Sequence, residues 1–176
     1  EEGGVHLNFD CLAHWMEGQA SYTPRFQRLV ETDIARDDDY LSLNCAGFSE
    51  SEYANFCFAA LPRLIEVFLP YRARVETNSE VALADWDRGG EEYSRTGRDV
   101  DGRDSVYRVW PVSYWDEELC RRSFGLSAEE VVARAEPECD QACVLAGGAF
   151  LLVDSKVVSE PADLDVLDAR IKARLV

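Results

Sequence analysis

The stretch that decides the fold is SESEYANFCFAALPRLIEVFL, residues 49–69. It opens with Ser49 and Glu52 at the spacing of a capping box, which is typical of a helix N-terminus. The apolar residues that follow recur at intervals of three and one, which places them on one helical face and excludes a strand. They are Tyr53, Phe56, Cys57, Ala60, Leu61, Leu64, Ile65, Phe68 and Leu69. Because Pro62 has no backbone N–H, we expect one kinked helix or two abutting helices here, forming the core helix.

The rest of the chain mixes helix and strand patterns without a regular βαβ rhythm. Strands are predicted at 5–12, 40–45, 75–77, 81–83, 105–112 and 150–153, where β-branched and aromatic residues gather or alternate with polar ones. Further helices are predicted at 24–36, 115–123, 127–135 and from Ser159 to the C-terminus, from cap residues and apolar spacing. The polar stretch 85–104 contains four glycines beside many charges and is predicted to be an exposed loop or a hairpin.

These elements indicate an α+β fold in a single globular domain, residues 1–176. We expect a mixed or antiparallel sheet, packed against the apolar-striped helix at about 50–69 and against an amphipathic C-terminal helix. A chain of this length can bury roughly 70% of the surface that it exposes when unfolded, so it needs no disulfide to hold its core.

The net charge is the unusual feature of the composition. The chain has 18 Lys and Arg against 34 Asp and Glu, a formal charge of −16. Nucleic acids and anionic membrane surfaces are disfavoured partners, because both require a basic surface. The apolar runs are also too short and too often broken by glycine to span a bilayer, which takes about 20 residues.

Six cysteines, an even number, would permit three disulfides. Cys45 and Cys57 lie in strongly apolar segments, where a buried thiol behaves as a small hydrophobic side chain. Because the chain is long enough to hold its core without disulfides, we expect reduced cysteines and a cytoplasmic protein. A periplasmic location is the alternative, if a leader has been removed.

A search for chemistry finds no motif that names an activity. Cys139 and Cys143 lack the paired close spacing of a structural zinc site, and the acidic run 99–104 lacks the Glu that closes an EF-hand loop. No nucleophile elbow, phosphate-binding loop or dinucleotide fingerprint occurs. Asp85 beside Trp86 and Asp116 beside Trp115 come closest to a catalytic acid in an aromatic setting. We therefore expect no catalytic residue, no metal and no cofactor; a small carboxylate-dependent hydrolase is the minor alternative.

The remaining feature is an acidic surface with aromatic residues near it. Aromatic anchors surrounded by charge of one sign are typical of electrostatically steered protein interfaces. The residues predicted to bind a partner are Asp37, Asp38, Asp39, Trp86, Glu91 and Glu92. Their charge could also serve solubility alone.

In its general character the chain resembles the small acidic immunity proteins of bacterial toxin systems, including those that guard against type VI secreted effectors. The resemblance rests on the single-domain size, on the acidic runs at 37–39 and 116–118, and on the absence of a catalytic motif. It implies a protein that is not an enzyme and that binds and neutralises a cognate toxin, expected to be basic. An acidic secretion chaperone or adaptor is the alternative.

Overall fold

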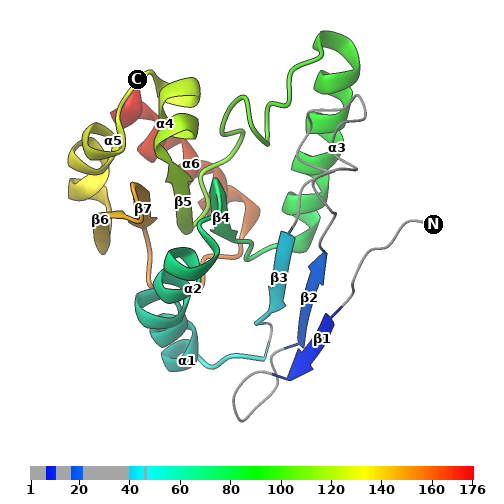
Figure 1. The fold of residues 1–176 in the computed structure, drawn as a ribbon, viewed down its shortest axis with the longest axis vertical. Coiled ribbons are helices and arrows are strands. Elements are labelled where there is room, and N and C mark those ends of the chain that lie inside the picture. Colours follow the sequence, from blue (N-terminus) through cyan, green and yellow to red (C-terminus); the bar gives the residue numbers. More distant parts are fainter. Residues whose placement is uncertain (1–6, 11–16, 22–39, 46) are drawn as a thin grey trace. The chain divides into compact units, whose positions relative to one another are not determined.

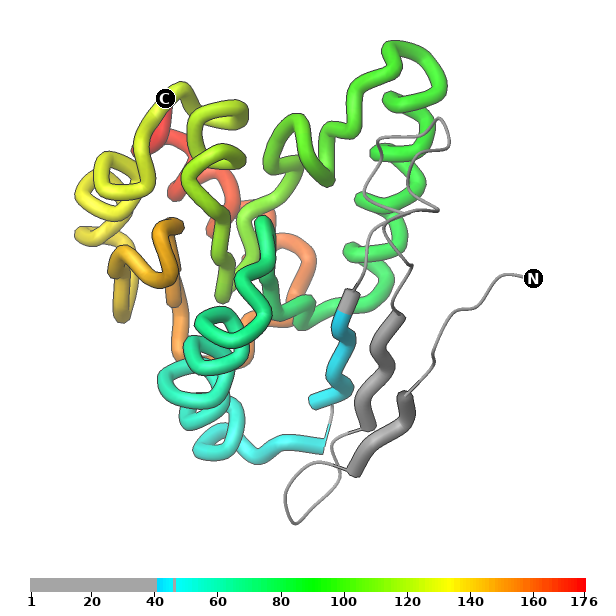
Figure 2. The backbone as a smooth tube through the Cα atoms, viewed as in Figure 1, coloured from blue at the N-terminus to red at the C-terminus, as the bar shows by residue number. Residues whose placement is uncertain are grey.

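The computed structural model describes residues 7–10, 17–21, 40–45 and 47–176 (Figures 1 and 2). The contacts along the chain divide it into two compact units, Glu1–Ser49 and Glu50–Val176.

The first unit contains a three-stranded antiparallel sheet in the order β1-β2-β3. Its strands are β1 (Leu7–Asp10), β2 (Glu17–Ser21) and β3 (Tyr40–Asn44). β1 and β3 fall within the strands predicted at 5–12 and 40–45, whereas β2 was not predicted. The helix predicted at 24–36 and the acidic residues Asp37, Asp38 and Asp39 lie outside the described residues.

The second unit contains a four-stranded sheet in the order β4-β5-β7-β6, antiparallel throughout. The strands are β4 (Arg72–Val75), β5 (Val112–Asp116), β6 (Gln141–Leu145) and β7 (Gly148–Leu152). The helices are α1 (Glu50–Asn55), α2 (Leu61–Phe68), α3 (Ser79–Thr96), α4 (Glu117–Phe124), α5 (Ala128–Ala135) and α6 (Pro161–Leu175). The predicted α+β class with an antiparallel sheet is confirmed.

The segment at 50–69 is helical from Glu50 to Phe68, but it is not a regular α-helix. A π-helical turn, η3 (Phe56–Ala60), joins α1 to α2, and Pro62 lies in the first turn of α2. Phe56 is 6% exposed and Ile65 is 1% exposed, so the stripe faces the core as far as Ile65. A π turn takes about one residue more than an α turn and rotates the residues beyond it. Phe68 and Leu69, at the end of the stripe, are exposed where the helix ends and Leu69 takes a left-handed conformation with φ 46°.

The centre of the sheet is buried on both faces. On one face, Trp115 of β5 and Leu151 of β7 pack with residues of three helices, among them Leu119 of α4, Val131 of α5 and Ile171 of α6. The alternate residues of β7, Phe150 and Leu152, point to the opposite face and are also fully buried. Such continuous burial is typical of a central strand with cover on both sides.

Gly148 begins β7 where the backbone of β5 comes close. A Cβ atom built on Gly148 would lie 2.4 Å from the carbonyl oxygen of Trp115 and 2.7 Å from the ring of Tyr114. No side chain fits at that separation, so β5 and β7 can pair in this register only with glycine here.

The strand predicted at 105–112 is wrong: the strand begins at Val112 and ends at Asp116. Before this strand, the backbone N–H groups of Val109 and Trp110 bond to side chains instead of to a neighbouring strand. Val109 N donates to the Asp168 carboxylate at 2.7 Å, and Trp110 N donates to Ser113 Oγ at 3.0 Å. Pro111 has no N–H to donate. Val106, Val109 and Trp110 are buried, but in an irregular segment and not in a strand.

The exposed loop or hairpin predicted at 85–104 is also wrong over most of its length, as is the strand predicted at 81–83. Residues 79–96 form α3, which Asn78 caps by accepting a hydrogen bond from Val81 N at 2.9 Å and which ends at Gly97 with φ 72°. Few residues of α3 are buried, so the helix has almost no apolar stripe to recognise in the sequence. Only residues 97–104 lie in a loop.

The described cysteines include several thiols outside any disulfide: Cys45, Cys120, Cys139 and Cys143. Cys139 precedes β6 and Cys143 lies within it, so the pair spans the start of a strand and not one turn of a helix. Burial raises the pKa of both Cys120 and Cys139 to about 12. These thiols remain protonated at neutral pH, and a protonated thiol is a poor nucleophile.

Alkaline pH is expected to destabilise the second unit. Burial raises the pKa of Tyr114 from 10.0 to about 12 and that of Cys120 from 9.0 to about 12. The folded state therefore holds protons that the unfolded chain releases. The stability from these groups is complete below about pH 9 and falls by up to about 1.4 kcal/mol per pH unit for each group as the pH approaches 12.

Urea denaturation from about pH 8 to about pH 11 measures this loss. The variants Tyr114→Phe and Cys120→Ala should each reduce the slope, because each removes one of the titrating groups. An unfolding free energy that stays constant to about pH 11 would contradict the expectation.

Candidate functional site

The helix α3 is fixed at its N-terminal end by side chains that reach the segment before α6. Asn78 Nδ2 donates to the carbonyl oxygen of Ser159 at 2.8 Å, and the Thr77 hydroxyl donates to the carbonyl of Val158. Ala82 packs with Trp110 and with Leu164 of α6. The helix is thus held against the rest of the second unit from its first turn.

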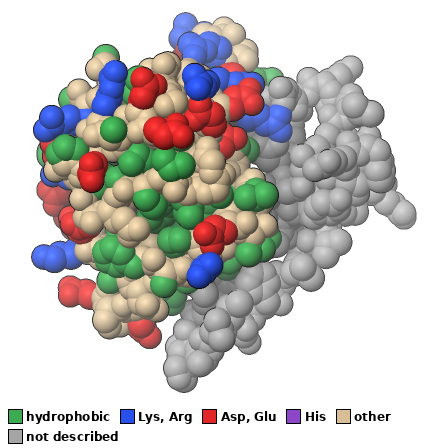
Figure 3. All heavy atoms as spheres, turned by 60° about the vertical axis from the view of Figure 1, so that its left-hand side comes forward, with side chains coloured by type: hydrophobic (Ala, Val, Ile, Leu, Met, Phe, Trp, Pro, Cys, Tyr) green, Lys and Arg blue, Asp and Glu red, His purple; other side chains and the backbone are tan. Residues whose placement is uncertain are grey.

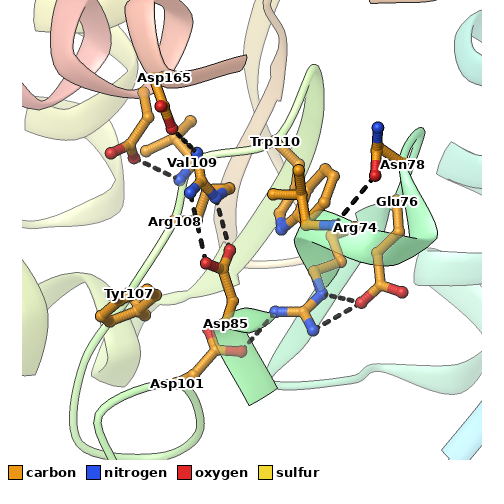
Figure 4. A network of polar contacts seen from close by, with 12 residues as sticks. Arg74, Glu76, Asn78, Asp85, Asp101, Tyr107, Arg108, Val109, Trp110 and Asp165 are labelled. Carbon is orange, nitrogen blue, oxygen red and sulfur yellow. Dashed lines mark hydrogen bonds and ion pairs between the residues drawn. The ribbon is translucent and has the colours of Figure 1, made fainter. Parts of the chain in front are cut away.

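A buried ion pair anchors the middle of α3. The Asp85 carboxylate is 2% exposed and accepts hydrogen bonds from Arg108, with Nε 2.5 Å and Nη2 3.3 Å from its two oxygens (Figure 4). Arg108 Nη1 also donates to Asp165 of α6 at 2.8 Å. Burial acts to lower the pKa of Arg108, but the hydrogen bonds to both carboxylates outweigh it, and the pKa is raised. Arg108 therefore stays charged and ties α3 to α6.

A second buried carboxylate, Asp101, binds the two arginines of β4. Arg74 Nη1 lies 2.8 Å and Arg72 Nη1 lies 3.1 Å from its oxygens. Arg74 also pairs with Glu76 at 2.6 Å, and its guanidinium lies 6.0 Å from the centre of the Trp110 ring. Figure 4 shows Arg74 and Arg108 reaching these carboxylates from opposite sides of Trp110. Asp101 is therefore occupied in holding the 97–104 loop to the sheet.

The opposite side of α3 is exposed and has a different composition. Leu83 is 64% exposed and Trp86 is 47% exposed, which is unusual for large apolar side chains. Acidic residues at helical spacing lie beside them. We call the set Glu80, Leu83, Trp86, Asp87 and Glu91 the α3 outer face. Its acids form no ion pair with a described residue, whereas Asp85 on the inner side does.

The structure divides the residues predicted to bind a partner. Trp86 and Glu91 both belong to the α3 outer face, five residues apart along the helix. Glu92 lies on the other side, where Arg95 Nη2 is 2.6 Å from its carboxylate. The hydrogen bond from Arg95 lowers the pKa of Glu92. The sequence analysis missed Glu80, Leu83 and Asp87, which three-and-four spacing would have found had residues 79–96 been recognised as a helix.

The two carboxylates singled out as possible catalytic acids both have structural partners. Asp85 binds Arg108, as described above. Asp116 caps α4 by accepting a hydrogen bond from Leu119 N at 2.7 Å. Burial raises the pKa of Asp116. Within the described ranges, no group of three or more His, Cys, Asp and Glu side chains is arranged to hold a metal ion.

No family model matches the chain, no curated protein matches it, and no solved structure matches it. Among the described residues, no helix has the length and apolar character needed to cross a membrane.

Proposed function

We propose that this chain is an immunity or inhibitor protein that binds and neutralises a cognate, basic toxin enzyme. The α3 outer face is the contact surface, with Trp86 as its anchor. One observation carries the proposal: Glu80, Asp87 and Glu91 form no ion pair with a described residue, yet they lie on one helical face beside the exposed side chains of Leu83 and Trp86.

The pairing of charges elsewhere supports this assignment. Buried and half-buried acids of the second unit, such as Asp101, Asp168 and Glu138, are matched by nearby Arg or Lys. The acids of the α3 outer face have no such partner among the described residues. An excess of charge with complementary sign speeds the encounter of two proteins, and a fully covered aromatic side chain slows their separation. Solubility alone would account for the acids, but not for an exposed Leu and Trp among them.

The anchoring of α3 also suits a binding role. The helix is held by its cap, by Ala82 and by the Asp85–Arg108 pair, so little ordering is needed when a partner binds. Preorganised surfaces retain more of their contact energy as affinity.

The test is surface plasmon resonance against the product of the neighbouring gene, at several salt concentrations. The triple variant Glu80→Gln, Asp87→Asn, Glu91→Gln should slow association at least about tenfold at low salt, and the wild-type on-rate should fall steeply as salt rises. Trp86→Ala should instead speed dissociation. It should raise Kd roughly thirtyfold, which corresponds to about 2 kcal/mol of binding free energy.

A matched control removes the same charge from exposed acids elsewhere: Glu129→Gln, Glu136→Gln and Glu160→Gln. This variant should bind nearly as the wild type does. Asp37→Asn, Asp38→Asn and Asp39→Asn together test the acidic run outside the described residues. Absence of a complex, or equal effects of the α3 triple and the control triple, would contradict the proposal. Binding without inhibition of the enzyme would favour the secretion chaperone.

A further inference from the structure

The four-stranded sheet has two edges with opposite character. β4 forms one edge and carries Arg72 and Arg74, and charged side chains on an edge strand discourage pairing with another chain. β6 forms the other edge, and its sequence QACVL has no charge and no proline. Val144 on this strand is 45% exposed. Only the β6 edge therefore lacks the usual protection.

The hairpin turn decides which backbone groups of β6 point outward. β6 and β7 are joined by Ala146 and Gly147, with φ 47° and 80°, as in a two-residue type I′ turn. Leu145 and Gly148 then form a hydrogen-bonded pair, and the pattern alternates from there. The N–H and C=O of Ala142 and Val144 point away from β7. Neither residue has a hydrogen bond beyond the ladder to any described residue.

We propose that β6 is the interface of a symmetric dimer, in which it pairs antiparallel with β6 of a second copy. The two-fold axis passes beside Cys143, so Ala142 lies opposite Val144 of the second copy and the two Cys143 residues face each other. The outward groups of Ala142 and Val144 bond to one another in this register, and Cys143 occupies the non-hydrogen-bonded position. The two sheets become one continuous sheet.

The charge of the chain restricts the places where a second copy can bind, and the uncharged β6 edge is such a place. Two molecules of charge −16 repel each other wherever their acids meet. In the proposed register Asp140 lies opposite Ala146, not opposite Asp140 of the second copy. Figure 3 brings the left-hand side of Figure 1 forward and shows hydrophobic side chains gathered over the middle of that face, with charged ones above and below them. Pairing at β6 thus avoids opposing like charges.

The dimer should be weak, because five residues of strand bury little surface compared with a standard interface. Sedimentation equilibrium of the purified full chain over a roughly hundredfold concentration range should reveal a monomer–dimer equilibrium. Val144→Pro removes an outward N–H and should raise the dimer Kd at least about tenfold, whereas Val144→Thr keeps the N–H and should leave the Kd within about twofold.

Cross-linking tests the register. Opposed residues at a non-hydrogen-bonded position have Cα atoms about 4.5 Å apart, within the range of a disulfide. Diamide, which accepts the two electrons and two protons that the thiols release, should yield a covalent dimer of wild type and of Cys139→Ser, but not of Cys143→Ser. Circular dichroism checks that each variant is folded, and Val144→Lys replaces Val144→Pro if the latter is not.

A monomer at every concentration would overturn the dimer, and so would a dimer that tolerates both Val144→Pro and Val144→Lys. A monomeric chain that binds the neighbouring gene's product, and loses that binding in Val144→Pro, would assign the edge to a strand of that partner instead. None of the measurements on the chain alone depends on the toxin, so failure here and failure of the proposed function can be told apart.

Discussion

Replacing Phe56 with alanine is expected to lower the free energy of unfolding by about 3–5 kcal/mol. Phe56 begins the π-helical turn and is only 6% exposed. Truncation removes a buried ring and leaves a cavity that the surrounding side chains cannot fully close, because the interior is close-packed. Urea denaturation at neutral pH measures the loss.

Phe58→Ala is the matched control, since it is the same substitution two residues further along the same π turn. Phe58 is 45% exposed, so its truncation should cost less than about 1 kcal/mol. The contrast between the two variants reports the direction that the helix faces. A loss below about 1 kcal/mol for Phe56→Ala would mean that the stripe faces solvent or a partner.

Removal of the Asp85 carboxylate should cost about 3 kcal/mol or more. Asp85→Ala leaves the Arg108 side chain, which is 10% exposed, with Asp165 as its only ion-pair partner among the described residues. The stability is lost because a largely buried guanidinium then lacks a buried counter-charge. Because the pair anchors α3, proteolysis near residues 79–96 should also become faster.

The control for this prediction is Asp165→Ala, which removes the other carboxylate from the same arginine. The Asp165 side chain is 70% exposed, and exposed ion pairs contribute about 0–1 kcal/mol. The double variant Asp85→Ala, Arg108→Met should cost less than the sum of the two single changes, since it removes the unpaired charge. Equal losses for Asp85→Ala and Asp165→Ala would be inconsistent with a buried anchor.

The parts of the fold that could be predicted are those with a strong local signal. The capping box of Ser127 and Glu130 begins α5, and Gly125 ends α4 with φ 70°. α6 begins at Pro161, as its proline and apolar spacing indicated. In each case the signal lies within one helical turn, so no knowledge of the distant chain was needed.

The parts that could not be predicted depend on contacts between distant residues. α3 is held by Asp85 pairing with Arg108, far along the chain, and its two adjacent glycines suggested a loop. The turn of Ala146 and Gly147 lacks the Asn or Asp that is typical of a two-residue hairpin turn, so β6 was not predicted. A sequence pattern indicates periodicity, but it does not show which charged residues far apart in the chain form a buried ion pair.

The candidate site was predictable to the same extent. Trp86 and Glu91 stood out by composition alone and lie on the α3 outer face. Glu92 has the same chemistry as Glu91 but faces Arg95, a difference that only the helical phase reveals. Leu83 was missed because residues 81–83 were predicted to form a strand, whereas they lie in α3, where Leu83 is exposed.

The close approach at Gly148 sets a limit on how the sequence can vary. Even alanine at this position would bring its methyl carbon to 2.4 Å from the Trp115 carbonyl oxygen, so substitution requires the two strands to separate. Random mutagenesis with selection for folded protein should therefore recover almost no replacement at Gly148, while the neighbouring turn residue Ala146 varies. Any homologue with this sheet should likewise keep glycine at the start of the strand that follows the hairpin, whatever its charge or partner.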